Sequence, residues 1–229
     1  MDEWKCGRVD ETTARRRMVT EQLEAREIGD PRVLEAMRSV PRHMFVPEPI
    51  RERAYEDRPQ PIGAHQTISQ PLMVGMMTEL LHLWGDERVL EVGTGSGYQA
   101  AILSELASHV VTIERHEALA NRSRELLNHL GYCNVEVHVG DGTLGYPPSA
   151  PYDRILVTAG SPSVPQPLVD QLAPNGRMVI PVGAADIQML KILHKDSRGI
   201  VTVDEYGECL FVPLIGSHGW PDTPGRESA

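Results

Sequence analysis

The sequence has few cysteines, and their spacing suits neither a cross-link nor a metal. Its 229 residues include three, Cys6, Cys133 and Cys209. Three is an odd number and no two of them form a CxxC pair, so we expect neither a disulfide framework nor a structural zinc site. The N-terminus, Met1-Asp-Glu-Trp-Lys5, lacks the basic and apolar regions of a secretory signal. These absences predict a protein of a reducing compartment, the cytoplasm.

Long apolar runs and an excess of basic charge are also missing. No run approaches the ~18 to 20 apolar residues of a membrane-spanning helix, so we expect no membrane association. The chain has 22 basic and 32 acidic residues, for a formal net charge of −10. Because duplex nucleic-acid binders neutralise phosphates with Lys and Arg, this balance disfavours such a partner. The one dense basic run, Arg15–Arg17, lies in a predicted helix, and we interpret it as a solvated face.

What is present is the composition of a folded domain. The hydrophobic fraction is 41% and the charged fraction 24%, both close to globular averages. A chain of this length suits one domain with a full core. We predict a single domain over residues 1–229, with N-terminal helices and a loop (1–71), an α/β core (72–216) and a flexible tail (217–229).

The first 71 residues are predicted to form two helices and a long connection. Residues 11–40 divide into two helices at Gly29-Asp-Pro31, with Asp30 as an N-cap and Pro31 at the first helical position. Residues 41–71 contain six prolines and little periodicity, which predicts an irregular segment. Loops of this length in a compact chain are usually functional or disordered.

From residue 72 onward, predicted strands and helices alternate. We expect strands at 88–92, 109–113, 135–139, 154–158 and 177–181, and helices at 72–84, 98–107, 116–130 and about 167–172. This alternation indicates a doubly wound α/β fold, with a mostly parallel sheet and helices on both faces. Residues 188–194 and 200–206 predict an antiparallel hairpin at the C-terminal edge of the sheet, followed by a last strand at 209–215.

A glycine-rich turn follows the first strand of this core. Gly93, Gly95 and Gly97 stand between a strand and a helix, at the sheet edge where ligands of open α/β folds bind. Glycine there allows positive φ and close approach of the backbone to a ligand. A dinucleotide fingerprint needs a glycine at position 98, which is Tyr98, and no Gly-Lys-Ser/Thr follows. A nicotinamide dehydrogenase is therefore disfavoured, and a purely structural turn is the remaining alternative.

Two acidic residues restrict the class of ligand that the glycine-rich turn could bind. Glu114 ends the second strand, 21 residues after Gly93, where a carboxylate can accept both hydroxyls of a ribose. Asp141 follows the third strand, where its carboxylate could reach an adenine amino group. Each also has a local interpretation, Glu114 as a helix N-cap and Asp141 as a turn residue. Placed at the ends of successive strands, they together favour an adenosine-containing ligand.

The motifs resemble those of a known family. Glu91-Val-Gly-Thr-Gly-Ser-Gly97 is similar to the first motif of class I methyltransferases, and Gln66-Thr-Ile-Ser-Gln-Pro71 upstream of it is more specific. Three further stretches and Pro165 complete the pattern: Val40-Pro-Arg-His-Met-Phe-Val-Pro47, Gly140-Asp-Gly142 and Val212-Pro-Leu214. Over about residues 15 to 216 the chain resembles the protein-L-isoaspartate (D-aspartate) O-methyltransferases.

The resemblance implies a Rossmann-like class I fold and methyl transfer from S-adenosyl-L-methionine to the free α-carboxylate of L-isoaspartyl, and also D-aspartyl, residues in damaged proteins. The ester collapses to a succinimide, and the cofactor product is S-adenosyl-L-homocysteine. The implied catalytic residues are Ser69 and Thr67. The implied cofactor residues are Glu91, Gly93, Thr94, Gly95, Gly97, Glu114, Arg115, Asp141 and Gly142. The implied substrate residues are His65, Gln66, Ile68, Ala159, Gly160 and Pro213.

Two stretches depart from the family pattern. Thr158-Ala-Gly-Ser-Pro162 stands where the family commonly has Ala-Ala-Pro, and Gly63-Ala-His65 where it often has Gly-x-Gly. Both belong to the substrate side, so substrate preference is affected more than cofactor identity. None of the nine histidines forms an HExxH motif, and we expect no metal. We also expect a monomer whose partners are isoaspartyl proteins.

The chemistry needs no general base, because a carboxylate is already ionised at neutral pH. Ser69 is then a hydrogen-bond donor that positions the carboxylate. From the residues alone, its alternative role is the N-cap of the helix that follows Gln70-Pro71. Two other functions stay open: a carboxyl methyltransferase for a dedicated modified peptide, and a non-catalytic adenosine-binding module. Nucleic-acid methyltransferases are disfavoured, since neither Asn/Asp-Pro-Pro-Tyr nor Pro-Cys is present.

Overall fold

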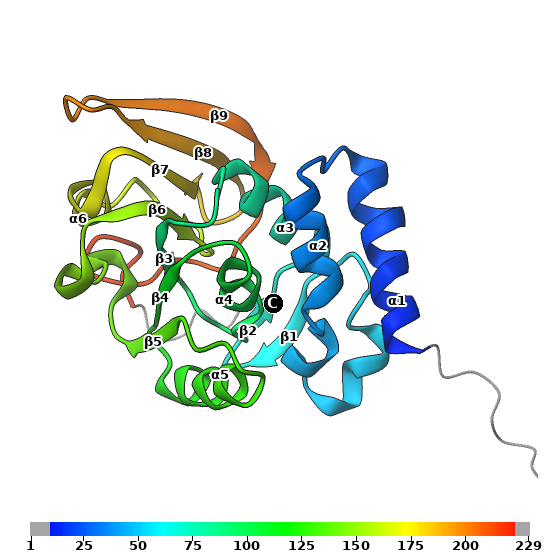
Figure 1. The fold of residues 1–229 in the computed structure, drawn as a ribbon. Helices are drawn as coiled ribbons and strands as arrows, with labels where there is room; N and C mark the ends of the chain where they lie inside the picture. Colours follow the sequence, from blue (N-terminus) through cyan, green and yellow to red (C-terminus); the bar gives the residue numbers. More distant parts are fainter. Residues whose placement is uncertain (1–9, 223–229) are drawn as a thin grey trace, which may run out of the picture.

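The computed structural model describes residues 10–222, which form a seven-stranded sheet between helices (Figure 1). The strand order is β5-β4-β3-β6-β7-β8-β9. The first five strands of this order are parallel and the last two are antiparallel to their neighbours. Their bounds are β3 Arg88–Val92, β4 His109–Glu114, β5 Val135–Val139, β6 Tyr152–Val157, β7 Leu172–Gly183, β8 Gln188–Lys195 and β9 Val201–Cys209. The predicted doubly wound fold with an antiparallel C-terminal edge is confirmed.

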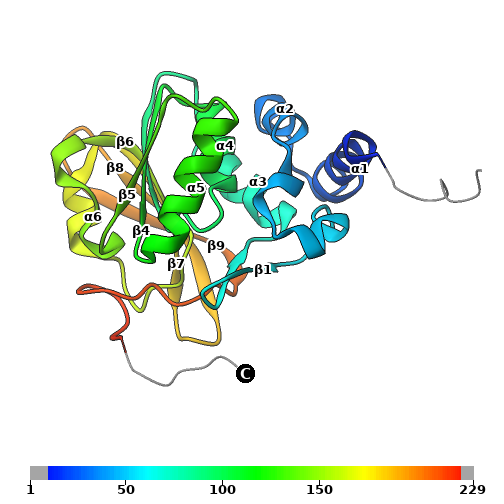
Figure 2. The ribbon, with the colours of Figure 1, turned by 90° about the horizontal axis from the view of Figure 1, so that it is seen from below.

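Helices cover both faces of the sheet. The helices are α1 Glu11–Met18, α2 Pro31–Ser39, α3 Pro71–Leu80, α4 Tyr98–Ser104, α5 Glu117–His129 and α6 Gln166–Gln171. Figure 2 shows α4 and α5 on one face, with α1 to α3 beyond them, and α6 on the other. The two faces correspond to two hydrophobic clusters, which β3 divides: Val89 points into the first and Leu90 into the second. Both side chains are fully buried, as expected for a central strand that is covered on both faces.

The N-terminal helices begin and end where the sequence predicts. The Asp30 carboxylate accepts a hydrogen bond from the Arg32 amide at 2.9 Å, and Pro31 occupies the first position of α2. α1 continues into a π-helical turn, Val19–Leu23, whose apolar residues pack into the first cluster. Within the basic run of α1, Arg16 and Arg17 are exposed, as a solvated face requires.

The segment 41–71 is more regular than its composition predicts. It contains two 3-10 turns, Arg42–Phe45 and Glu48–Arg53, and an antiparallel hairpin of β1 Gln60–Gly63 and β2 Gln66–Ile68. The turn places Ala64 and His65 at φ +51° and +54°, a conformation that usually requires Asn or Gly. The prediction of an irregular connection was wrong because this turn lacks the usual hairpin residues, while the burial of Ile62 holds the hairpin on the core.

The chain beyond the hairpin β8–β9 differs from prediction in two ways. The expected strand at 209–215 is absent, because β9 ends at Cys209 and the following residues form only isolated bridges, such as Gly160 with Pro213. The expected flexible tail does not begin at Ser217, whose amide donates to the Asp141 carboxylate at 2.7 Å. The indole of Trp220 donates to the Gly160 carbonyl at 3.0 Å. Residues 223–229 of that tail lie outside the described residues.

Two of the three cysteines lie in the described part of the chain, and both are free thiols. Cys133 is exposed and Cys209 is buried, where burial raises the pKa of its thiol to about 11. Cys6 lies outside the described residues. Between residues 10 and 222, no helix has the length and hydropathy needed to span a bilayer.

Candidate active site

A cavity of about 930 Å³ lies at the carboxyl ends of β3, β4 and β6. Most of its wall comes from the hairpin and Ser69, the glycine turn after β3, the end of β4, the loop after β6, and the C-terminal residues 210–215 and 220–222. Of the predicted site residues, the ones that line it are His65, Gln66, Thr67, Ile68, Ser69, Gly93, Thr94, Gly95, Glu114, Arg115, Gly142, Ala159 and Pro213. Glu91, Gly97, Asp141 and Gly160 do not. The fold therefore brings three distant motifs to one site.

The three glycines of the turn have different physical roles. A Cβ on Gly93, at φ +100°, would lie 2.4 Å from the Thr158 hydroxyl, so only glycine fits there. Gly95, at φ +53°, lines the cavity and donates its amide to Glu114. Gly97 faces α5 instead, since a Cβ there would lie 3.1 Å from the Cβ of Ser123. The first two glycines shape the ligand edge, and the third permits helix packing.

Glu114 is buried at the end of β4 and faces the cavity. One carboxylate oxygen accepts the Gly95 amide at 2.9 Å, and the other accepts the His116 amide at 2.9 Å. The N-cap of α5 is His116, which makes no side-chain capping bond, so the N-cap interpretation of Glu114 was wrong. Each carboxylate oxygen keeps further acceptor capacity, which suits the two hydroxyls of a ribose.

Asp141 takes the turn role that the sequence left as its alternative. Its carboxylate accepts the Thr143 amide at 2.9 Å, the Thr143 hydroxyl at 2.6 Å and the Ser217 amide at 2.7 Å. Burial raises the pKa of this carboxyl, but the hydrogen bonds from Ser217 and Thr143 outweigh it and hold the pKa below its ordinary value. Gly142, next in sequence, lines the cavity instead. Asp141 thus ties the C-terminal segment to the rim of the site.

Glu91 lies behind the glycine turn, completely buried. The Thr112 hydroxyl donates to one of its oxygens at 2.5 Å, and the Thr94 hydroxyl donates to Thr112 at 2.7 Å. The second oxygen of Glu91 has no hydrogen-bond partner among residues 10–222. The pKa of Glu91 is raised to about 8, mainly by burial and to a lesser extent by the Glu114 charge, which together outweigh the lowering effect of the Thr112 hydrogen bond. A chain of hydroxyls therefore connects a protonatable carboxyl to Thr94 on the cavity wall.

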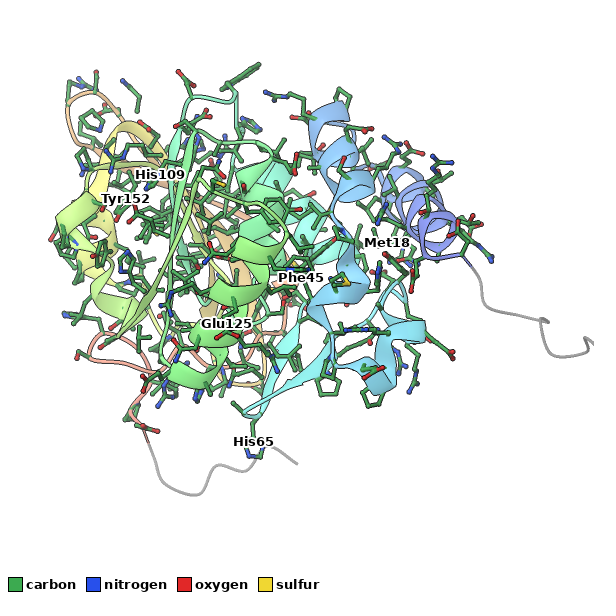
Figure 3. All side chains as sticks on the ribbon, turned by 60° about the horizontal axis from the view of Figure 1, so that its bottom comes forward. Met18, Phe45, His65, His109, Glu125 and Tyr152 are labelled. Atoms are coloured by element: carbon green, nitrogen blue, oxygen red, sulfur yellow. The ribbon has the colours of Figure 1, made fainter. Side chains whose placement is uncertain are left out.

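Ser69 is one of the residues that line the cavity. It lies between β2 and α3, half-buried, and its hydroxyl makes no hydrogen bond within the described chain. The N-cap interpretation of Ser69 was wrong, because the N-cap of α3 is Gln70, without a side-chain capping bond, and Pro71 is its first residue. Thr67 lines the same wall from β2 and is exposed. His65 lies at the tip of the hairpin and is exposed (Figure 3).

On the substrate side, Ala159 and Pro213 line the cavity and Gly160 holds them together. The Gly160 amide donates to the Val212 carbonyl at 2.8 Å, and its carbonyl accepts the Leu214 amide at 2.8 Å. A Cβ on Gly160 would lie 2.9 Å from the Gln188 side chain, so Gln188 can pack this closely only against a glycine. Gly160 is thus a structural joint between the loop after β6 and the C-terminal segment.

Of the wall formed by the C-terminal segment, the sequence-based prediction named Pro213 and missed the rest. Phe211, Trp220 and Asp222 line the cavity, and Asp222 forms an ion pair with Arg115 at 2.7 Å. The residues after Ser217 are polar and include Pro and Gly, a composition that predicted a flexible tail and not a cavity wall. A tryptophan in such a segment was the available signal, because large aromatic side chains are seldom left in a solvated tail.

The site fits S-adenosylmethionine. Its volume is that of a small-molecule pocket. Glu114 offers acceptors for a ribose beside the open backbone of Gly93 and Gly95, and Glu91 adds an unpartnered carboxyl oxygen behind them. In residues 10–222 no group of three or more His, Cys, Asp or Glu side chains could hold a metal ion. The fold and this site define a class I S-adenosylmethionine-dependent methyltransferase.

Comparison with known proteins narrows the class to one family. The model of the family "Protein-L-isoaspartate(D-aspartate) O-methyltransferase (PCMT)" matches residues 13–219. The protein-L-isoaspartate O-methyltransferase of Methanoculleus marisnigri is 57% identical over 206 residues, which cover 90% of this chain and 93% of that protein. The one of Methanoregula boonei is 58% identical over 206 residues, which cover 90% and 94%. The chain belongs to the protein-L-isoaspartate(D-aspartate) O-methyltransferase family.

Solved structures agree with this assignment. A protein-L-isoaspartate O-methyltransferase matches with a TM-score of 0.79 and 28% identity, covering 89% of this chain and 67% of that one. A Plasmodium falciparum protein of the same name, solved in complex with S-adenosyl-L-homocysteine, matches with a TM-score of 0.76 and 26% identity. That match covers 88% of this chain and 98% of the other.

Proposed function

We propose that this protein transfers a methyl group from S-adenosylmethionine to the α-carboxylate of L-isoaspartyl residues in damaged proteins. The methyl ester then collapses to a succinimide, whose hydrolysis returns part of the residue to normal aspartate. The observation that carries the assignment of the site is that Ser69, whose hydroxyl has no hydrogen-bond partner within residues 10–222, lines the same cavity as Glu114 and the glycine turn.

The residues on the cofactor side would hold the donor. The open backbone at Gly93 and Gly95 would allow close approach, and the Glu114 carboxylate would accept the ribose hydroxyls. Gly142 and Arg115 line the same part of the cavity. When bound, the cofactor supplies a methyl group activated by its positively charged sulfur.

The residues on the substrate side orient the nucleophile. The substrate carboxylate is ionised at neutral pH, so no proton has to be removed from it. The barrier falls mainly when a carboxylate oxygen is held in line at roughly 3 to 3.5 Å from the methyl carbon. Ser69 donates a hydrogen bond that holds this carboxylate, and Thr67 offers a second hydroxyl beside it. Apolar wall residues such as Ile68 and Phe211 reduce the hydration of the carboxylate, which makes it a better nucleophile.

The test of the function is a methyl-transfer assay with peptides that differ only at one linkage. We expect transfer to the isoaspartyl peptide and none to its aspartyl counterpart. A D-aspartyl peptide serves as a third arm that defines the substrate range. Transfer to neither linkage would refute the proposed function and leave only cofactor binding.

The test of the site is Ser69→Ala, with Ser197→Ala in the exposed β8–β9 turn as the matched control. We expect Ser69→Ala to keep cofactor binding, measured by calorimetry, and to lose roughly 10²-fold in kcat, as when one positioned donor is removed from an active site. The control should match the wild type. Full activity of Ser69→Ala on the isoaspartyl peptide would remove Ser69 from the mechanism.

A further inference from the structure

A completely buried arginine lies directly behind Ser69. Arg42, in the first 3-10 turn, has no exposed surface. Its Nε donates to the Ala54 carbonyl at 2.6 Å, and its Nη2 donates to the Ser69 carbonyl at 2.7 Å. Its guanidinium lies 4.8 Å from the centre of the Tyr98 ring. The planar guanidinium of Arg42 thus contacts the chain at Ala54, at Ser69 and at Tyr98, the first residue of α4.

No acidic side chain of the described chain forms an ion pair with this charge. Among residues 10–222, the one carboxylate that acts measurably on the charge is Asp57, which is already used by Arg26 at 2.8 Å and by the Leu72 amide at 3.1 Å. Burial raises the pKa of Tyr98 to about 12, so that phenol is neutral at physiological pH. Burial also lowers the pKa of Arg42, yet a guanidinium starts so high that it stays protonated.

The third nitrogen of Arg42 is unsatisfied. Its Nη1 is buried and makes no hydrogen bond of good geometry among residues 10–222, and the group that stabilises the charge most is the neutral phenol of Tyr98. A buried, uncompensated charge is costly, and a protein that only needed a clamp between two carbonyls could use a neutral donor. A substrate carboxylate that binds next to Ser69 would offset this cost. Its negative charge would interact strongly with the Arg42 guanidinium, because water is excluded there.

We propose that Arg42 is a positioning residue that holds Ser69 through its carbonyl and makes the Ser69 end of the cavity attractive to the substrate carboxylate. This inference rests on the proposed function. It assigns two separable contributions to one side chain. The bridge between the Ala54 and Ser69 carbonyls needs the planar fork of arginine, whereas the attraction for a carboxylate needs only a positive charge.

The experiment compares two peptides that differ in one charge. One contains isoaspartate with its free α-carboxylate, and the other carries the α-carboxamide in its place. Binding of each is measured with S-adenosyl-L-homocysteine present, so that no turnover occurs. For Arg42→Met we expect the carboxylate peptide to bind at least about tenfold more weakly, equivalent to about 1.4 kcal/mol. The carboxamide peptide should change less than about threefold, and cofactor affinity should be unchanged.

Arg42→Lys separates the two contributions and covers the case in which Arg42→Met does not fold. Lysine keeps the charge but cannot bridge both carbonyls, so we expect the preference for the carboxylate peptide to persist and kcat to fall by about tenfold or more. The matched control is Arg32→Met. Arg32 lies 4.9 Å over the Trp84 ring, outside the cavity, and its loss should change neither peptide's affinity.

Three results would overturn the proposal. If Arg42→Met weakens the binding of both peptides equally, Arg42 is only a structural clamp. If it weakens the binding of neither peptide, Arg42 has no role in the site. Loss of the carboxylate preference in Arg42→Lys would contradict the role of charge. Failure of the proposed function looks different, because the wild type itself would then neither methylate nor prefer the isoaspartyl peptide.

Discussion

Replacement of Glu91 by glutamine tests the electrostatics of the site most sharply. Glu91 is completely buried in β3, and one of its oxygens has no partner within residues 10–222. Burial raises the pKa of this carboxyl from an ordinary value of 4.5 to about 8. Glutamine has nearly the same shape and stays neutral at every pH, so the substitution removes only the titration.

The direction in which stability changes with pH follows from the protons that Glu91 binds in the folded and unfolded states. Between about pH 4.5 and 8 the folded protein keeps a proton on Glu91 that the unfolded chain has released. The stability linked to this proton is therefore fully present below pH 4.5 and is lost as the pH rises toward 8. In that window the free energy of unfolding falls by up to about 1.4 kcal/mol per pH unit. Relative to the wild type, Glu91→Gln should gain stability with rising pH, with an upper bound of about 5 kcal/mol at pH 8.

The assay is urea unfolding of both proteins without cofactor at pH 5, 6, 7 and 8. Glu125→Gln, on the exposed face of α5, is the matched control and should follow the wild type at each pH. Parallel pH profiles for the wild type and Glu91→Gln would refute the reasoning. So would a difference that grows toward low pH, because it would mean that the fold stabilises the ionised form of Glu91.

Two further predictions concern the turns around the cavity. Gly93→Ala should lower the free energy of unfolding by roughly 2 to 4 kcal/mol, because its Cβ would lie 2.4 Å from the Thr158 hydroxyl at φ +100°. A thermal melt within the error of the wild type would contradict this. Asp141→Asn should lower stability at pH 7, since the folded state depresses the pKa of Asp141 through hydrogen bonds such as that from Ser217. That stability is present above the ordinary pKa of 3.8 and is lost as the pH falls through the pKa of Asp141 in the folded state. A stability difference between the wild type and Asp141→Asn that is undiminished at pH 2 would refute this prediction.

Some of the structure was predictable because it depends on short stretches of sequence. The strands 88–92 and 135–139 were predicted with the bounds that the structure has, since each is a short run of β-forming residues between breakers. The glycine turn was predictable as well, because a strand followed by glycines can only turn at the sheet edge. Parallel topology then places Glu114 beside that turn without further information.

The family motifs predicted the function, but not how each residue acts. Ser69 had a local interpretation as an N-cap that only the backbone at Gln70 and Pro71 could decide. Asp141 was predicted to reach the ligand, and its carboxylate is instead used by Thr143 and by Ser217, which is 76 residues away. Sequence patterns describe neighbours along the chain, so they do not reveal a competing partner that arrives from elsewhere.

The sequence by itself therefore determined the alternation of strands and helices in the α/β core, the ligand edge of the sheet and the family. Local periodicity and glycine geometry suffice for the elements and the edge, and the resemblance of short motifs such as Gln66–Pro71 indicates the family. Only the tertiary structure decided that Arg42 is buried without a counter-charge and that Trp220 closes the cavity. Burial and pairing are properties of the packed chain, because the same side chain has a different free energy beside water than beside a carbonyl or an aromatic ring.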